Sequence, residues 1–206
     1  ERWMSLWKET LELQHNQEQL LLNIGCTDSL NIAVFVPLYD KILMNYPHLD
    51  LSIQSHHSSE LYGMLSEHNI DIGFVYHQLH YKNIISEKLF EEKLYLVQSE
   101  HPSVEKPIVH TDELDSTKEL FLSWDDNFQI WHDRWLSSVS RPHISADTIT
   151  LLDRLWKNAD TWMIAPESVI HELSRYRKVY VSELKNPAPN RICYKIKHKY
   201  PKTTSK

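Results

Sequence analysis

The sequence predicts an α/β fold made of two lobes, and two observations support this. Strand patterns alternate with helical patterns in the first part of the chain, and the alternation starts again after a proline-containing connection. A second proline-containing connection near the end offers the chain a way back to the first lobe. We therefore expect two Rossmann-like lobes joined by two crossover strands, a hinged arrangement.

Residues 1–19 are expected to form an N-terminal linker helix. Their apolar residues fall at helical spacing, with Glu and Lys between them. The apolar side either folds back on its own chain or pairs with the same helix of another chain, as a dimerisation helix would. The pattern favours neither interpretation.

Residues 20–99 are assigned to lobe I. LLLNIGCT predicts a buried strand, SLNIAVFVPLYDKILMNY a helix stopped by Pro47, and LDLSIQSHH a second strand. SSELYGMLSEHN predicts a helix capped by Ser58 or Ser59, followed by a third strand, IDIGFVY. Because no hairpin turn separates these strands, they are expected to lie parallel. IISEKLFEEKLYLVQS then predicts a strand pair or one bent strand.

Residues 100–186 are assigned to lobe II, with the first crossing expected near Pro102. ELFLSW predicts a strand, and DNFQIWHDRWLSSVS a helix that starts at Asp125 or Asp126. TITLLDRLWKNA predicts another helix, TWMIAP a buried strand and ESVIHELSRY a last helix. The strand–helix alternation of lobe I is thus repeated.

Residues 187–206 are expected to return to lobe I. Pro187 and Pro189 mark a bridge between two strand-like runs, VYVSEL and RICYKIKHKY. The second run would add a strand to the first sheet, which completes a clamshell with two connections.

The composition excludes several classes of protein. A net charge of −6 argues against a segment that neutralises nucleic-acid phosphates by itself. With three glycines no glycine-rich phosphate loop is possible, so no nucleotide cofactor is expected, and no other cofactor is indicated. Two cysteines are too few for a disulfide scaffold, which fits a reducing cytoplasm. No apolar run is long enough to cross a membrane, and no secretory signal is evident.

Three small polar residues, Thr27, Asp28 and Ser29, lie where the first strand ends and a helix begins. The carboxyl ends of parallel strands border a crevice, and a helix start offers unpaired N–H groups, so this site suits an anion. The alternative is that one of the three simply caps the helix. Asp28 counts against an anionic ligand unless its side chain points away.

Several stretches resemble, in their order and spacing, the effector-binding domain of LysR-type transcriptional regulators. They are LNIGCT, VPLYDKILMNYPHLDLSI, SSELYGMLSEHNIDIGFVY, KLFEEKLYLVQSEHP, and TITLLDRLWKNA leading to WMIAPESV. The resemblance covers roughly Leu20 to Tyr200 and implies a periplasmic-binding-protein-like fold of type 2. It departs from the family at KNADTW, where the family has a glycine-rich turn, and at the C-terminus, where the family has a further helix.

The resemblance also implies a function. A small-molecule effector, an anionic metabolite being one candidate, is expected to bind between the lobes of a homodimer or homotetramer, and DNA contact is expected only through a helix-turn-helix domain absent from this chain. Two rivals share the clamshell, a solute-binding protein of a transporter and an enzyme. No nucleophile, base and orienting acid stand in a recognisable order, so an enzyme is not expected.

Other candidate side chains follow the predicted strands or start the predicted helices on both lobes, so they are expected to face the same cleft. Their alternative roles are surface loop and core packing. The full candidate set for effector binding is Thr27, Asp28, Ser29, His56, Tyr76, His77, Ser123, Trp124, Thr148 and Pro166.

The histidines in two nearby loops allow a metal-site hypothesis. His56, His57, His77 and His80 have no Cys or carboxylate among them at a familiar ligand spacing, so no metal is predicted. A response to pH near neutrality is the weaker alternative.

Overall fold

A computed structural model of the chain describes residues 20–99, 107–136, 141–158 and 160–201. The linker helix expected at 1–19, the crossing expected near Pro102 and the last residues of lobe I, 202–206, lie outside this part. Within the described ranges no helix has the length and apolar character to span a membrane.

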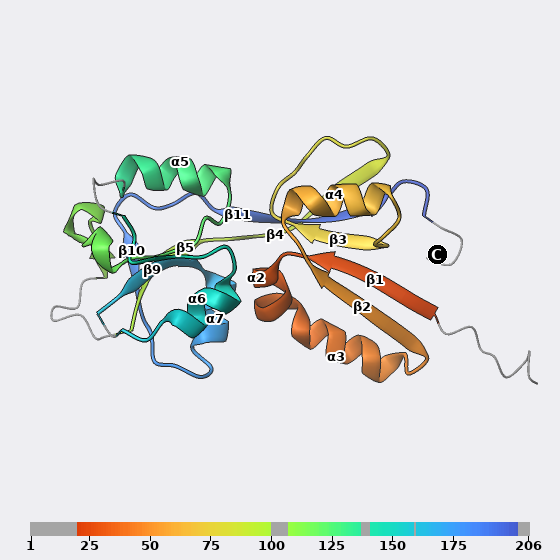
Figure 1. The fold of residues 1–206 in the computed structure, drawn as a ribbon, viewed down its shortest axis with the longest axis horizontal. Helices are drawn as coiled ribbons and strands as arrows, with labels where there is room; N and C mark the ends of the chain where they lie inside the picture. Colours follow the sequence, from red (N-terminus) through yellow and green to blue (C-terminus); the bar gives the residue numbers. More distant parts are fainter. Residues whose placement is uncertain (1–19, 100–106, 137–140, 159, 202–206) are drawn as a thin grey trace, which may run out of the picture.

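The structure consists of two lobes, each with its own sheet (Figure 1). Lobe I contains β1 (Leu20–Cys26), α2 (Asp28–Leu30), η1 (Asn31–Phe35), α3 (Val36–Asn45), β2 (Leu49–Ser55), α4 (Ser58–Ser66), β3 (Ile72–Val75), β4 (Ile84–Glu92) and β11 (Arg191–His198). Lobe II contains β5 (Leu94–Gln98), β6 (Ile108–Val109), η2 (Thr111–Glu113), η3 (Ser116–Lys118), β7 (Leu120–Phe121), α5 (Asp126–Trp135), β8 (Ile144–Ser145), α6 (Ile149–Leu155), β9 (Trp162–Pro166), α7 (Glu167–Leu173) and β10 (Tyr180–Leu184).

The sheet of lobe I has the strand order β2-β1-β3-β11-β4. β1 lies parallel to β2 and β3, as the absence of hairpin turns predicted, and β11 is antiparallel to β3 and β4. The carboxyl ends of β1, β2 and β3 therefore meet at one edge of the sheet. The returning strand β11 brings the chain back into the sheet of lobe I.

The main sheet of lobe II has the order β6-β10-β5-β9, with β5 antiparallel to both of its neighbours. This differs from the parallel sheet expected for this half. The reason is that β5 enters from lobe I and inserts between β10 and β9. The short strands β7 and β8 pair in parallel, and a bridge between Glu119 and Trp162 joins them to the main sheet.

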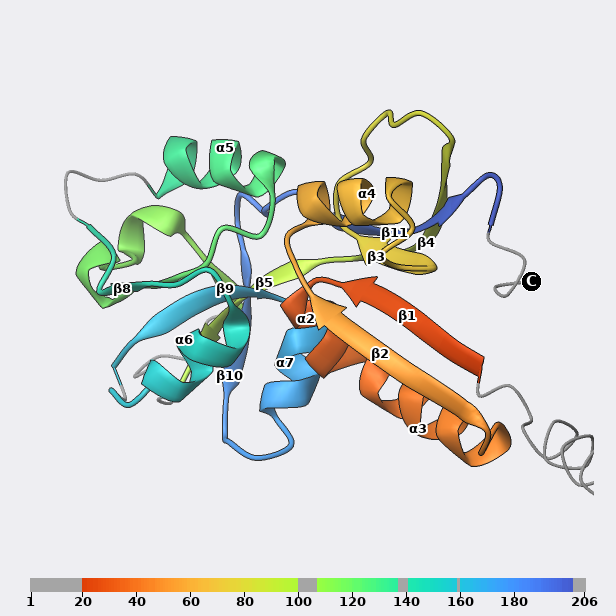
Figure 2. The ribbon, with the colours of Figure 1, turned by 45° about the vertical axis from the view of Figure 1, so that its right-hand side comes forward.

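The chain crosses between the lobes twice. The first crossing is at Lys93, between β4 and β5, and the second covers residues 185–190 between β10 and β11 (Figure 2). The boundary predicted at residue 99 lies too far along the chain, because residues 94–98 pair within the second sheet. A nearly continuous strand makes this crossing, so a proline is not needed there.

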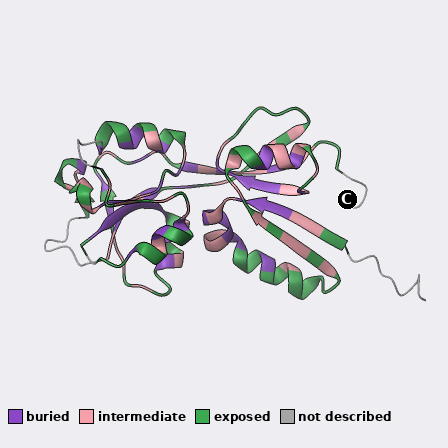
Figure 3. Cartoon of the chain, in the orientation of Figure 1, coloured by how far each residue is buried: buried purple, intermediate pink, exposed green. Residues whose placement is uncertain are grey.

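Each lobe has a separate core. In lobe I, Leu30 and Phe35 pack against one face of the sheet, and Leu61 and Leu65 of α4 pack against the other. Lobe II is built around the fully buried strand β9, which Figure 3 shows as a continuous buried segment. Two gaps in lobe I admit no side chain, since a Cβ on Gly25 or Gly73 would lie within 3 Å of neighbouring side-chain atoms.

The lobes also touch beside the crossings. Ile32 and Ala33, on the π-helical turn η1, pack against the core of lobe II. Pro37 follows this turn and has no N–H to donate to it, which favours an irregular helix here. The irregular turn therefore forms part of the contact between the lobes.

Candidate functional site

A cavity of about 280 Å³ lies between the lobes, at the carboxyl ends of β1, β2 and β3. Lobe II closes it with the residues before α5 and at the start of α6. The lining residues are Thr27, Asp28, Ser29, Ser55, His56, His57, Ser58, Glu60, Tyr76, Leu122, Ser123, Trp124, Asp147, Thr148, Ile149 and Arg191. A wider hollow of about 910 Å³ adjoins it and shares the lining residues His57, Ser58, Ser123, Trp124 and Asp147.

The structure brings most of the predicted site residues together. Those that line the cavity are Thr27, Asp28, Ser29, His56, Tyr76, Ser123, Trp124 and Thr148. His77 lines the adjoining hollow instead. Pro166 lines neither, because it is buried at the end of β9, where it pairs with Leu94 and precedes α7.

The helix starts around the cavity are capped in different ways. Thr148 accepts a hydrogen bond from the Leu151 N–H at 3.4 Å and so caps α6. α4 starts after His57 rather than after Ser58 or Ser59, and the Glu60 side chain accepts the His57 N–H at 3.1 Å. The Ser58 hydroxyl is thereby free to accept the Tyr76 N–H at 3.2 Å. The Thr27 hydroxyl oxygen is buried and has no hydrogen-bond partner among the described residues.

Asp28 joins the two lobes. Its carboxylate accepts the backbone N–H of Thr150 at 3.1 Å and the Thr150 hydroxyl at 2.9 Å, across the cleft from α2 to α6. The carboxylate is thus occupied by lobe II and stabilises the start of α6 electrostatically. The Asp28 side chain therefore points toward lobe II.

Two histidine side chains lie near carboxylates on the rim. The His56 ring lies 3.4 Å from Glu60, and His77 Nε2 lies 3.8 Å from the carboxylate of Asp126 in lobe II. Among the described residues no three His, Cys, Asp or Glu side chains gather closely enough to hold a metal ion.

Arg191 lies at the base of the cavity and is the most informative residue that the sequence reasoning missed. It is the first residue of β11 and only 3% exposed. Its guanidinium carbon lies 3.3 Å from the Tyr76 ring centroid and 4.8 Å from that of Trp124. Its position directly after the Pro187–Pro189 bridge was the available signal, because a residue that re-enters the first lobe must border the cleft.

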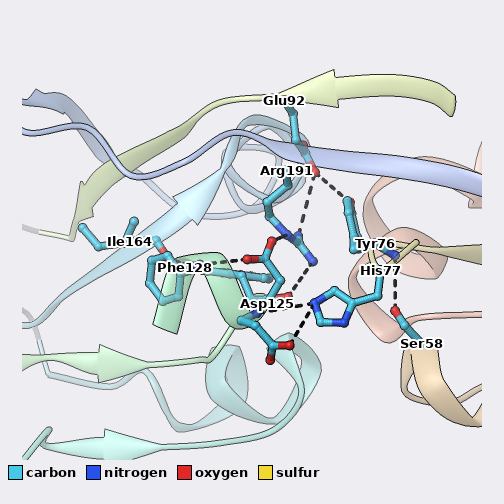
Figure 4. A network of polar contacts seen from close by, with 10 residues as sticks. Ser58, Tyr76, His77, Glu92, Asp125, Phe128, Ile164 and Arg191 are labelled. Carbon is cyan, nitrogen blue, oxygen red and sulfur yellow. Dashed lines mark hydrogen bonds and ion pairs between the residues drawn. The ribbon is translucent and has the colours of Figure 1, made fainter. Parts of the chain in front are cut away.

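Tyr76 is held in place by polar contacts at both ends. Its hydroxyl donates to Glu92 at 2.7 Å, and burial raises the pKa of this hydroxyl well above its ordinary value. The hydroxyl therefore stays protonated and donates to Glu92. Figure 4 shows Tyr76, Glu92 and Arg191 converging where the strands cross between the lobes.

The other residues that were missed are neighbours of predicted ones, apolar walls, and Glu60 in the first turn of α4. Ser55, His57, Ser58 and Asp147 lie next to candidate residues in sequence, while Leu122 and Ile149 give the cavity its apolar surface. The combination of apolar walls and converging polar groups is typical of a small-molecule site.

The family model described as LysR substrate binding domain matches residues 15–200. The chain belongs to the LysR substrate binding domain family. The HTH-type transcriptional regulator CzcR of Bacillus anthracis is 22% identical to this chain over 163 residues. That match covers 78% of this chain and 54% of CzcR, so the chain spans about half the length of the curated relative.

Solved structures of LysR-type regulatory domains share the fold. The reduced form of the OxyR regulatory domain from Pseudomonas aeruginosa superposes with a TM-score of 0.71 at 16% identity, covering 88% of this chain and 91% of that one. The regulatory domain of MexT, a transcriptional activator in Pseudomonas aeruginosa, gives a TM-score of 0.72 at 11% identity, covering 87% and 90%. These likenesses confirm the predicted two-lobe fold of the LysR regulatory domains.

The cysteines do not form a redox pair in this structure. Cys26 and Cys193 are both free and fully buried, and burial raises the pKa of both thiols. A sensing thiol needs a low pKa and access to solvent. The likeness to OxyR therefore concerns the fold and not these thiols.

Proposed function

We propose that this chain is the effector-sensing part of a bacterial LysR-type transcriptional regulator. The observation that supports this most strongly is the cavity between the lobes, whose wall takes Thr27 and Ser29 from lobe I and Ser123 and Thr148 from lobe II. A ligand that touches both walls has different contacts at different lobe angles. Only this difference in affinity can shift the balance between the angles.

The effector we propose is a small polar metabolite, because about 280 Å³ is at the lower end of the range of ligand pockets. The expected anionic character is limited by the wall. Asp28, Glu60 and Asp147 contribute carboxylates, whereas Arg191 contributes one buried cation. This balance favours an effector with at most one negative charge. One relative, OxyR2 from Vibrio vulnificus, has been solved in a sulfate-bound form.

The remaining parts of the proposal come from the relatives. We propose that the whole protein is cytoplasmic, that it works as a homodimer or homotetramer, and that it contacts DNA through an N-terminal domain outside this chain. The match to CzcR, an HTH-type regulator, supports the DNA-binding partner domain. It also favours a regulator over the solute-binding protein of a transporter.

A reporter assay tests the proposal. In the full-length regulator, Thr27→Phe and Thr148→Phe place bulk in the cavity, whereas Lys157→Phe places the same ring at an exposed position outside its wall. We expect effector-dependent transcription to be lost in both cavity variants and kept in the control, with DNA binding intact in all three. Unchanged induction in both cavity variants would show that this cavity is not the sensing site.

A further inference from the structure

Arg191 lies at both crossings between the lobes. It begins β11, directly after the second crossing, and it pairs in the sheet with Glu92, the last residue of β4 before the first crossing. The two residues therefore move together as one rung of the sheet. Any rotation of lobe II about the crossings takes place next to this rung.

The guanidinium of Arg191 contacts each lobe separately. On the lobe I side it stacks on Tyr76, and on the lobe II side Nη2 donates to the Trp124 carbonyl oxygen at 3.3 Å. Tyr76, Trp124 and Arg191 all line the cavity. A ligand in the cavity would thus lie beside the two residues that hold the guanidinium.

Two N–H groups of this buried side chain are unsatisfied. Nε and Nη1 have no hydrogen-bond partner among the described residues. Nη1 lies 3.9 Å from Glu92 Oε1, and Nε lies 3.9 Å from Asp125 Oδ2. Both distances are about 1 Å longer than a charge-assisted hydrogen bond. Leaving a buried donor unpaired is unfavourable, so the arrangement favours a shift that closes one of these gaps.

The two carboxylates differ in what they can still accept. Glu92 accepts the Tyr76 hydroxyl with Oε1 and the Ser168 N–H with Oε2. Asp125 accepts the Phe128 N–H with Oδ1, while no hydrogen bond to its Oδ2 is found in the described part of the chain (Figure 4). The unmet donor Nε and the unmet acceptor Oδ2 thus face each other across the hinge.

We propose that Arg191 is the positioning residue that couples cavity occupancy to the lobe angle. In this structure Arg191 Nε and Asp125 Oδ2 are too far apart for a hydrogen bond, and we call this pair open. A rotation of lobe II that moves Asp125 about 1 Å closer to Arg191 closes the pair into a direct hydrogen bond. Ligand contact with Tyr76 or Trp124 biases the choice between the open and closed pair. This inference rests on the proposed function for its biological meaning, whereas the effect of the Arg191–Asp125 contact on the lobe angle is testable in the ligand-free chain.

Distance measurements between the lobes test the coupling in the ligand-free chain. Spin labels on Lys41→Cys in α3 and Ile130→Cys in α5 report the separation of the lobes, and both positions are exposed. Cys26 and Cys193 are fully buried, so labelling is directed to the introduced thiols. Diluting the labelled chain with unlabelled chain removes distances between subunits.

Asp125→Asn is the main variant, since asparagine keeps the helix cap but not the charge. Asp125→Ser keeps the cap with a shorter side chain and serves if the first variant folds poorly. Asp112→Asn is the matched control, because the Asp112 side chain is 85% exposed and lies 3.9 Å from His110 of its own lobe. Arg191→Lys keeps the charge but loses the planar guanidinium.

We expect Asp125→Asn and Arg191→Lys to change the ratio of the populations with shorter and longer lobe separation by at least about fivefold. This factor corresponds to about 1 kcal/mol. The double variant should differ little from either single one, because both remove the same pair. Asp112→Asn should match the wild type. Distance distributions of Asp125→Asn and Arg191→Lys that superimpose on the wild type, in folded protein, would overturn the coupling. Loss of induction in the cavity variants would remain a separate result on the sensing site.

Discussion

Single residues in this domain gain their roles from partners on other elements. Asp28 accepts hydrogen bonds from Thr150 in the first turn of a helix of the opposite lobe, and Arg191 stacks on Tyr76 although 115 positions separate them in sequence. The positions of Thr27, Asp28 and Ser29 follow from a strand end that can be read in the sequence. The role of Arg191 does not, because it depends on which residues the fold brings to its side.

The buried thiol of Cys193 provides a prediction at this scale. Burial raises its pKa from the ordinary value of 9.0 to about 12, and Glu92 adds to the rise. Above about pH 9 the unfolded chain releases this proton while the folded chain keeps it, so the free energy of unfolding falls as the pH rises toward 12. The contribution is at most about 1.4 kcal/mol per pH unit.

Urea unfolding at pH 8 and pH 10 checks this expectation. Cys193→Ala should lose less stability than the wild type between the two pH values, because it lacks the titrating group. Equal losses in both proteins would mean that the Cys193 thiol is not shielded in the folded state.

At the scale of elements, the strand and helix order could be predicted well and the sheet membership less well. The parallel strands β1, β2 and β3 were found from apolar runs without hairpin turns. β5 was predicted to belong to lobe I, whereas it pairs in the sheet of lobe II. The strand pattern of β4 continues through Lys93, and local patterns do not show which strand pairs with which. The capping residue of α5, Asp125, was among the two predicted, whereas the capping residue of α4, His57, lies one residue before the predicted Ser58.

Two glycines provide a matched pair of substitutions. A Cβ on Gly25 in β1 would lie 2.5 Å from Leu61 Cδ2 and 2.6 Å from Ile70 Cδ1, in the packed layer under α4. We expect Gly25→Ala to lower the free energy of unfolding by roughly 1–3 kcal/mol through overpacking. A Cβ on Gly63 in α4 meets nothing within 4 Å, so Gly63→Ala should raise it by roughly 0.5–1 kcal/mol.

Denaturant unfolding of the two variants and the wild type measures both effects. The two changes in the free energy of unfolding need not be equal in size, but they must have opposite signs. If Gly25→Ala is as stable as the wild type, the side chain of Leu61 in α4 does not pack closely against Gly25 of β1.

At the scale of the whole molecule, the lobes are separate cores that the described residues connect at several places. These include the two crossings, the contact of Ile32 and Ala33 with lobe II, the hydrogen bonds of Asp28 to Thr150 and the hydrogen bond of Arg191 to Trp124. Such limited contact allows the lobe angle to change without unfolding either core. The cavity is lined by residues of both lobes, so a ligand bound in it would contact both of them.

The measurement that tests this account most directly is a thermal-shift titration of the 206-residue chain with small polar metabolites that fit the cavity. Two variants accompany the wild type, Ser123→Trp, which fills the cavity from lobe II, and Lys157→Trp, which carries the same ring on an exposed surface. The account predicts that compounds which raise the melting temperature of the wild type also raise that of Lys157→Trp, but not that of Ser123→Trp. Equal shifts in all three proteins would contradict binding between the lobes.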